Sequence, residues 1–169
     1  VLHTNTEVYY MKDNCLVKTY SAFEPSGLPK TKFEINSTVL ITGGIGKLGL
    51  HFANYLYEKY KVNLVLVGHS DLNNEKALAI TDLSNKGCHV IYEKADVTDF
   101  NSMKSVVEKA DKYFGKIDTV IHAAGIVSDK VISIKDYNEF YNIISVKALG
   151  ALVLAEVTKR DPIKNFILF

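Results

Sequence analysis

The sequence has little net charge, few cysteines and no histidine spacing typical of a metal site. Its 169 residues carry a formal net charge of +1, which gives no indication of a nucleic-acid or membrane-surface partner. Cys15 and Cys88 lie far apart and neither belongs to a CxxC pair, so we expect two free thiols in a reducing compartment. Because the five histidines show no metal-ligand spacing, we expect no bound metal.

Long apolar runs and signal-peptide features are also missing. No uninterrupted apolar run is long enough to span a bilayer, and the N-terminal stretch VLHTNTEVYY is polar and mixed. We therefore expect a cytoplasmic protein with no membrane partner. The length and the apolar share of 47% fit a single soluble domain with one core.

Residues 1–37 differ from the rest of the chain. The runs EVYYM and CLVKTYSAF flank a polar KDN, which predicts a β-hairpin. Pro25, Gly27 and Pro29 then indicate a linker. We divide the chain into a hairpin and linker at 1–37 and a second region at 38–169.

The second region alternates short apolar strands with amphipathic helices. Strands are expected at 39–42, 63–67, 89–92, 119–122 and 165–169, and helices at 47–60, 73–86, 102–114 and 139–159. This order predicts a parallel sheet covered on both faces, which is an α/β doubly wound Rossmann-like fold. We expect the fold to be truncated after its fifth strand, with an exposed sheet edge there.

The segment TVLITGGIGKLG follows the first of these strands and opens a helix. Gly43, Gly46 and Gly49 form a G-x-x-G-x-x-G pattern, which lets backbone N–H groups and a helix N-terminus approach a pyrophosphate. A tight strand–helix turn without a ligand is the alternative. The predicted cofactor contacts in this segment are Thr42, Gly43, Gly44, Ile45, Gly46, Leu48 and Gly49.

The end of the second strand in this region bears on the choice between NADPH and NADH. It reads VGHSD, and no acidic residue stands directly at the strand end to bind the ribose hydroxyls. His69 and Ser70 are predicted to bind a 2′-phosphate, so NADPH is favoured, whereas Asp71 is close enough to keep NADH open. An exposed loop histidine is the alternative for His69.

Six motifs together resemble a known family. They are TGGIGKLG, VLVGHS, DVTD, IDTVIHAAG, SVKALGALVL and NFILF, spread from about Val39 to Phe169. The chain resembles the ketoreductase domains of modular polyketide synthases, within the short-chain dehydrogenase/reductase superfamily. HAAG with the later VK-x-x-G is the specific part of the resemblance.

The resemblance implies further site residues. Asp96 and Val97 would contact the adenine, and the HAAG residues Ala123, Ala124 and Gly125 would lie along the ribose and leave room for the nicotinamide. Lys147 would be the active-site lysine on the long helix, which favours a phenolate-like proton donor electrostatically. A solvated helix lysine is the alternative for Lys147.

Several positions depart from the family pattern. Only Asp129 remains of the Leu-Asp-Asp stereochemical fingerprint, which favours the class that forms the D-configured alcohol. The family usually has arginine where His69 stands, and arginine is a permanent bidentate phosphate ligand. The family's catalytic serine and tyrosine follow the fifth strand, beyond Phe169.

Two YxxxK matches, Tyr55 to Lys59 and Tyr57 to Lys61, fall on the first predicted helix and are interpreted as chance. In the family a truncated Rossmann-like subdomain precedes the catalytic one. Residues 1–37 would be its closing strands and linker.

The expected function is therefore NADPH-dependent reduction of a β-ketoacyl thioester on an acyl carrier protein. This chain would hold the cofactor, would be inactive in isolation, and would join other synthase domains or the rest of its own domain. A non-catalytic structural or degenerate half-domain is one alternative, supported by the short chain and His69. A sugar-nucleotide epimerase is another, although HAAG followed by Lys147 argues against it.

Overall fold

The computed structural model describes residues 7–22 and 33–169 and divides the chain into two compact units, 1–31 and 32–169. In the first unit, β1 (Val8–Met11) and β2 (Asn14–Val17) pair antiparallel, so the predicted hairpin is confirmed. The predicted linker at Pro25, Gly27 and Pro29 lies outside the described residues.

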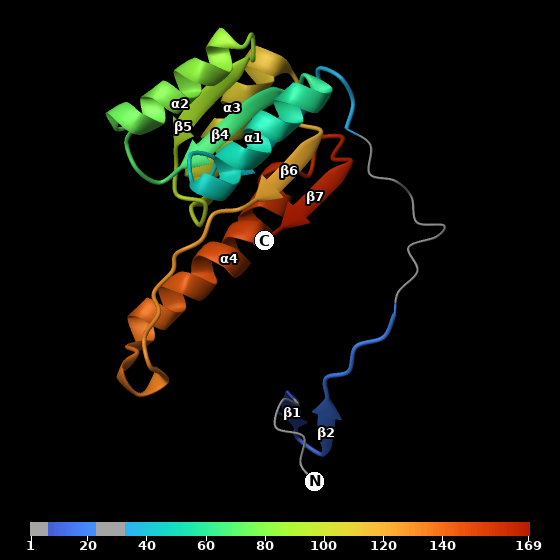
Figure 1. Cartoon of the computed structure of the whole chain (residues 1–169), viewed down its shortest axis with the longest axis vertical. Coiled ribbons are helices and arrows are strands. Elements are labelled where there is room, and N and C mark those ends of the chain that lie inside the picture. The colour runs from blue at the N-terminus through green and yellow to red at the C-terminus, as the bar shows by residue number, and fades with distance from the viewer. Residues whose placement is uncertain (1–6, 23–32) are drawn as a thin grey trace. The chain divides into compact units, whose positions relative to one another are not determined.

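The second unit contains a five-stranded parallel sheet in the order β5-β4-β3-β6-β7 (Figure 1). Its strands are β3 (Thr38–Thr42), β4 (Asn63–Gly68), β5 (Val90–Lys94), β6 (Thr119–His122) and β7 (Asn165–Leu168). The chain builds outward from β3 through β4 to β5, and then returns to build β6 and β7 on the other side of β3. The predicted doubly wound Rossmann-like fold is confirmed, and its topological switch lies between β3 and β6.

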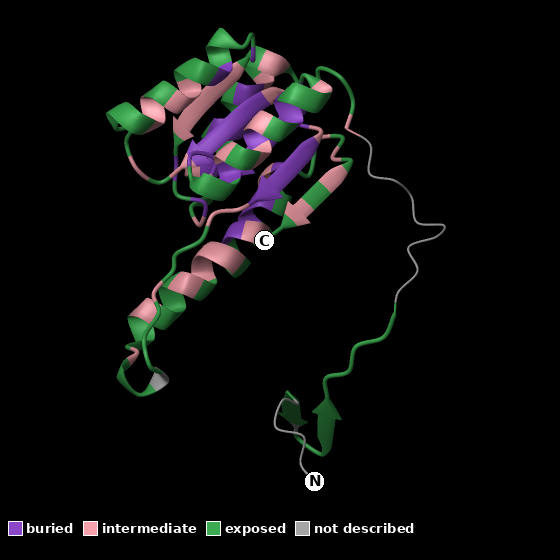
Figure 2. Ribbon diagram, in the orientation of Figure 1, coloured by how far each residue is buried: buried purple, intermediate pink, exposed green. Residues whose placement is uncertain are grey.

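Helices cover both faces of this sheet. They are α1 (Lys47–Tyr60), α2 (Asn74–Asn85), α3 (Phe100–Phe114) and α4 (Tyr137–Val157). Successive residues along a strand point their side chains to opposite faces of the sheet. Ile41 therefore packs in one core with residues of α1 and α2, and Leu40 packs in a second core with residues of α3 and α4. Figure 2 shows β3, β4 and β6 buried between these layers and the outer strand β7 more exposed.

Side-chain caps set the helix starts. Asn73 accepts a hydrogen bond from the Lys76 amide at 2.9 Å, so the structure selects Asn73 rather than Asp71 as the N-cap of α2. Asp99 and Asp136 cap α3 and α4, which therefore begin at Phe100 and Tyr137, two residues before the predicted starts. The predicted strand at 89–92 is shifted to Val90–Lys94.

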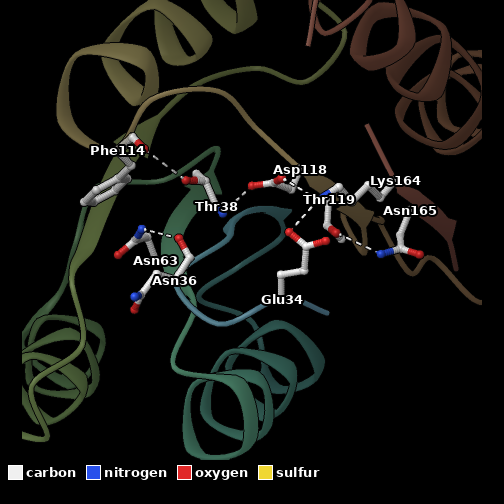
Figure 3. Close-up of polar contacts among 9 residues, drawn as sticks. All are labelled: Glu34, Asn36, Thr38, Asn63, Phe114, Asp118, Thr119, Lys164 and Asn165. Carbon is white, nitrogen blue, oxygen red and sulfur yellow. Dashed lines mark hydrogen bonds and ion pairs between the residues drawn. The ribbon is translucent and has the colours of Figure 1, made fainter. Parts of the chain in front are cut away.

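Polar contacts fix the amino ends of the strands (Figure 3). The Asp118 carboxylate, just before β6, accepts a hydrogen bond from the Thr38 amide at the start of the neighbouring strand β3, at 2.9 Å. Lys164 Nζ lies 2.6 Å from Glu34 Oε2 and 3.6 Å from Asp118 Oδ1. These contacts tie the entry to β3 and the entry to β7 to the start of β6, and they leave the opposite, carboxyl end of the sheet open for a site.

The helix α4 is more apolar than the sequence suggested. Its 21 residues include an 18-residue window with mean hydropathy 1.5, of which 17% is buried, so this helix has the length and composition of a membrane span. Asn142 and Lys147 interrupt its apolar residues, which is why no uninterrupted run was evident. Its C-terminal part packs on the sheet through Val153 and Leu154, while its N-terminal part extends past the sheet (Figure 1). The expectation of no membrane partner stays a prediction.

Candidate functional site

A cavity of about 600 Å³ lies at the carboxyl ends of the strands, at the topological switch between the paired strands β3 and β6. Eleven of the predicted cofactor residues line it: Thr42, Gly43, Ile45, Gly46, His69, Ser70, Asp96, Val97, Ala123, Ala124 and Gly125. These residues lie at the carboxyl ends of β3, β4, β5 and β6 or in the loops that follow them. Because the strands are parallel and paired along their length, their carboxyl ends meet at one edge of the sheet. Their assignment as cofactor contacts stays a prediction that this placement supports.

Five predicted site residues do not line the cavity: Gly44, Leu48, Gly49, Asp129 and Lys147. Eight lining residues were not predicted: Val67, Gly68, Ala95, Thr98, Ile126, Asn142, Ser145 and Val146. Most of these adjoin predicted residues along the same strand ends. Asn142, Ser145 and Val146 come from α4, and their spacing of three and four residues is the signal that could have placed one helix face on the cavity.

The glycines of the first loop have different structural roles. Gly43 has φ +65°, and a Cβ there would lie 2.9 Å from the backbone of Ala123 and Ala124, so only glycine lets this loop meet the end of β6. A Cβ at Gly49 would lie 2.3 Å from the Gly43 carbonyl oxygen. Gly49 therefore serves the packing of α1 against the loop rather than the cavity surface.

The N-terminus of α1 is open to an anion. Its N-cap residue is Gly46, which has no side chain to accept hydrogen bonds, and the first turn contains no acidic residue. The first amide groups and the positive end of the helix dipole are therefore left without a local negative partner. Gly43, Ile45 and Gly46 line the cavity beside this helix end, and a helix N-terminus of this kind is a common phosphate site in other proteins.

A buried histidine connects this loop to α4. His122 is 1% exposed, and its Nδ1 lies 2.7 Å from Thr42 Oγ1. Its Nε2 lies 3.0 Å from the carbonyl oxygen of Val146 and 3.2 Å from that of Lys147. Carbonyls only accept hydrogen bonds, so Nε2 carries the proton and the Thr42 hydroxyl donates to Nδ1. Thr42 Oγ1 in turn accepts from the Ala124 amide at 3.3 Å.

This chain of hydrogen bonds needs a neutral imidazole. Burial lowers the pKa of His122 below its ordinary value of 6.5, although the two helix carbonyls partly oppose that shift. Gly150 allows the close approach, because a Cβ there would lie 3.2 Å from the imidazole and 3.0 Å from Val97. The VK-x-x-G pattern thus has a physical reason in the packing of α4 on β6.

Lys147 lies just outside the cavity lining. Its Nζ donates a hydrogen bond to the carbonyl oxygen of Phe169, the residue after β7. Its side chain passes over Gly125, where a Cβ would lie 3.0 Å from Lys147 Cε. Because Gly125 itself lines the cavity, the positive charge of Lys147 stands next to the cavity wall.

The stereochemical loop folds onto the start of α4. Glu139 accepts hydrogen bonds from Ser128 Oγ and, at 2.9 Å, from Lys130 Nζ. Lys135 Nζ donates to the Ser128 carbonyl at 3.0 Å. These contacts leave Asp129 outside the cavity lining, so its predicted role in stereochemistry gains no support from its position.

The tyrosines of the two YxxxK matches lie on α1. Lys59 Nζ donates to Tyr55 Oη at 3.0 Å, and Tyr57 Oη donates to the Lys86 carbonyl at 2.7 Å. Neither tyrosine is among the residues that line the cavity. Within the described ranges 7–22 and 33–169, no group of three or more His, Cys, Asp or Glu side chains is arranged to hold a metal ion.

A doubly wound sheet with a glycine-rich turn at its switch point is the architecture of the dinucleotide-binding folds. The model of the KR domain family matches residues 37–169, and the chain belongs to this ketoreductase family. The predicted membership is confirmed, and it favours the ketoreductase interpretation over the sugar-nucleotide epimerase.

Curated relatives are polyketide synthases. The chain is 41% identical to polyketide synthase PksM of Bacillus subtilis (strain 168) over 131 residues, 78% of this chain and 3% of that protein. It is 31% identical to PksN of the same organism over 135 residues, 79% of this chain and 2% of that protein. The chain therefore corresponds to a small part of each synthase.

Solved structures of ketoreductases share the fold. An N-terminal ketoreductase from the macrolactin assembly line matches with TM-score 0.78 and 28% identity, covering 92% of this chain and 30% of its own. A ketoreductase domain from the bacillaene assembly line matches with TM-score 0.75 and 27% identity, covering 94% and 38%. NAD⁺-bound xylitol dehydrogenase shares the fold alone, at TM-score 0.68 and 23% identity, covering 77% and 49%.

Proposed function

We propose that this chain forms the cofactor-binding half of a ketoreductase that uses NADPH to reduce a β-ketoacyl thioester on an acyl carrier protein. The observation that carries the proposal is the cavity at the β3–β6 switch, with the glycine turn and the uncapped start of α1 on its wall. Its volume of about 600 Å³ lies in the range of small-molecule and cofactor sites.

The residues present fit a nicotinamide dinucleotide. The turn around Gly43 and Gly46 would receive the pyrophosphate, and Asp96 and Val97 would face the adenine. One Asp96 oxygen is already engaged, because it accepts hydrogen bonds from the Thr98 amide at 2.8 Å and the Thr98 hydroxyl at 2.7 Å, which fixes this loop. Gly125 has no side chain to occupy the nicotinamide end of the cavity.

The cofactor would supply a hydride to the substrate carbonyl carbon. The chain's own residues would hold that cofactor and provide positive charge beside the reaction. Lys147, next to Gly125, would favour the negative charge that develops as a proton donor loses its proton. We propose that the donor tyrosine and its serine partner lie outside residues 1–169, and that the other domains of a cytoplasmic synthase are the partners of this chain.

A non-catalytic half-domain is the second candidate. It is favoured by Lys147, which lies outside the cavity lining. The two candidates differ in whether the cavity binds a cofactor.

A pair of glycine substitutions tests cofactor binding. Gly43→Ala places a methyl group 2.9 Å from the backbone at the end of β6, whereas Gly115, with φ +80°, has nothing within 4 Å of its Cβ position. Alanine at a positive φ costs about 1–3 kcal/mol, and Gly115 has ψ −157°, a region that essentially only glycine adopts, so Gly115→Ala controls for backbone strain in a place with no close neighbours.

We expect NADPH to bind the parent chain and Gly115→Ala alike in a fluorescence titration, and Gly43→Ala to bind at least about tenfold more weakly. Equal binding by both variants would contradict this site. Failure of the folded parent chain to bind either nicotinamide cofactor would support the non-catalytic candidate.

A further inference from the structure

The wall of the cavity formed by the end of β4 has no arginine. Gly68, His69 and Ser70 line it, and of these only His69 can carry a positive charge. A phosphate is recognised most strongly by a permanent cation in a fixed position, and histidine is not one. If NADPH binds as proposed above, a positive charge for its 2′-phosphate has to come from elsewhere in the fold.

Lys76 is in a position to supply that charge. It lies in the first turn of α2, where its amide N–H is fixed by the Asn73 cap. Its side chain turns back across the helix start, and Nζ donates a hydrogen bond to Ser70 Oγ at 2.9 Å. Lys76 is half-buried, whereas its neighbour Glu75 is exposed. Lys76 therefore stands directly behind a side chain that lines the cavity.

The loop that carries Ser70 is anchored against β5. Tyr92 Oη donates a hydrogen bond to the Ser70 carbonyl oxygen. The same tyrosine packs on Gly68, where a Cβ would lie 2.8 Å from the Tyr92 hydroxyl oxygen. Tyr92 holds the Ser70 carbonyl and Lys76 holds the Ser70 hydroxyl. The Ser70 hydroxyl and the Lys76 ammonium group therefore form a preorganised pair of polar groups.

The acidic residue of this loop is neutralised by a second lysine. Lys94 Nζ, at the end of β5, lies 2.7 Å from Asp71 Oδ2. This hydrogen bond and the charge of Lys94 lower the pKa of Asp71, so Asp71 stays ionised and paired. With Asp71 paired to Lys94, Lys76 is left as the cation beside Ser70, which suits a phosphate rather than a ribose hydroxyl.

We propose that Lys76, acting with Ser70, binds the 2′-phosphate of NADPH, and that Lys94 supports this choice by pairing with Asp71. The inference rests on the proposed cofactor function of the cavity. It assigns the preference for a phosphorylated cofactor to a helix lysine in place of an arginine at the strand end.

The test compares NADPH and NADH binding by the whole chain and by lysine variants. Lys76→Met keeps most of the side-chain stem and removes the charge, and we expect NADPH affinity to fall roughly 10- to 100-fold, the range for a lost charge-assisted hydrogen bond. NADH affinity should change by less than about twofold, since NADH has no 2′-phosphate. Lys76→Arg should retain the preference for NADPH.

Two further variants complete the test. Lys104→Met is the matched control, because Lys104 is an exposed lysine on α3 whose partner is Glu108 at 3.9 Å, and it should change neither affinity. Lys94→Met should shift the preference toward NADH, because it leaves the Asp71 carboxylate without its partner. The salt dependence of NADPH binding should be weaker in Lys76→Met than in the parent chain.

The outcomes separate the two proposals. NADPH binding by the parent chain with an unchanged NADPH-to-NADH ratio in Lys76→Met would overturn the role of Lys76 and leave the cofactor site intact. An equal loss of both cofactors in Lys76→Met would show a structural role for Lys76 and would also overturn the inference. Absence of binding to either cofactor by the folded parent chain would overturn the proposed function, and the role of Lys76 with it.

Discussion

Replacing His122 with leucine should remove the hydrogen bonds that connect Thr42, at the start of the glycine turn, to the helix that carries Lys147. Leucine has a similar size but cannot accept from the Thr42 hydroxyl or donate to the carbonyls of Val146 and Lys147. The Thr42 hydroxyl, buried and left without an acceptor, lowers the free energy of unfolding by about 1–3 kcal/mol. Loss of the hydrogen bond from His122 Nε2 to the carbonyls of Val146 and Lys147 lowers it by about 0.5–1.5 kcal/mol more. We expect His122→Leu to lower the free energy of unfolding by about 2–4 kcal/mol.

The assay is urea denaturation at neutral pH, with His89→Leu as the control. His89 is exposed just before β5, and its replacement should change the free energy of unfolding by no more than about 0.5 kcal/mol. Thr42→Val with His122→Leu should cost less than the sum of the two single changes by about 1 kcal/mol, because the double variant leaves neither partner unsatisfied. A small effect of His122→Leu, or strict additivity, would refute the network.

The pH dependence of stability and the activity of the chain give two more predictions. Because burial lowers the pKa of His122 in the folded state, protonation favours the unfolded chain. The difference in the free energy of unfolding between the parent protein and His122→Leu should therefore shrink as the pH falls below about 6.5, as measured by denaturant titrations. A difference that stays constant with pH would contradict this prediction. The chain alone should not oxidise NADPH with a β-keto thioester, and a measurable loss of absorbance at the NADPH band would show that it contains its own proton donor.

Most of the fold could be predicted because its signals are local. The strands are short apolar runs, and glycines or capping side chains mark the helix ends. The main errors lie at boundaries such as Asp99 and Asp136, where a side-chain cap starts the helix earlier than the apolar pattern does. Because parallel strands end at the same edge of the sheet, the residues after them lie together, so most of the predicted cofactor residues do line the cavity.

The remaining parts of the site depend on contacts between distant segments. The HAAG motif contains His122 but does not predict its contacts, because its partners lie 80 and 24 residues away in sequence. Lys76 and Ser70 are only six residues apart, but their contact depends on the direction of the Lys76 side chain, which the sequence does not give. Gly49 was predicted as a cofactor contact from its motif, but the sequence alone does not separate a glycine that meets a ligand from one that packs a helix.

The most direct test of the cofactor site is a backbone-amide NMR titration of the folded chain with NADPH. We expect saturable shifts at the amides of Gly43, Gly46 and Ala124. Absence of shifts in that turn at saturating NADPH, or shifts confined to other surfaces, would contradict the claim that the β3–β6 cavity holds the cofactor.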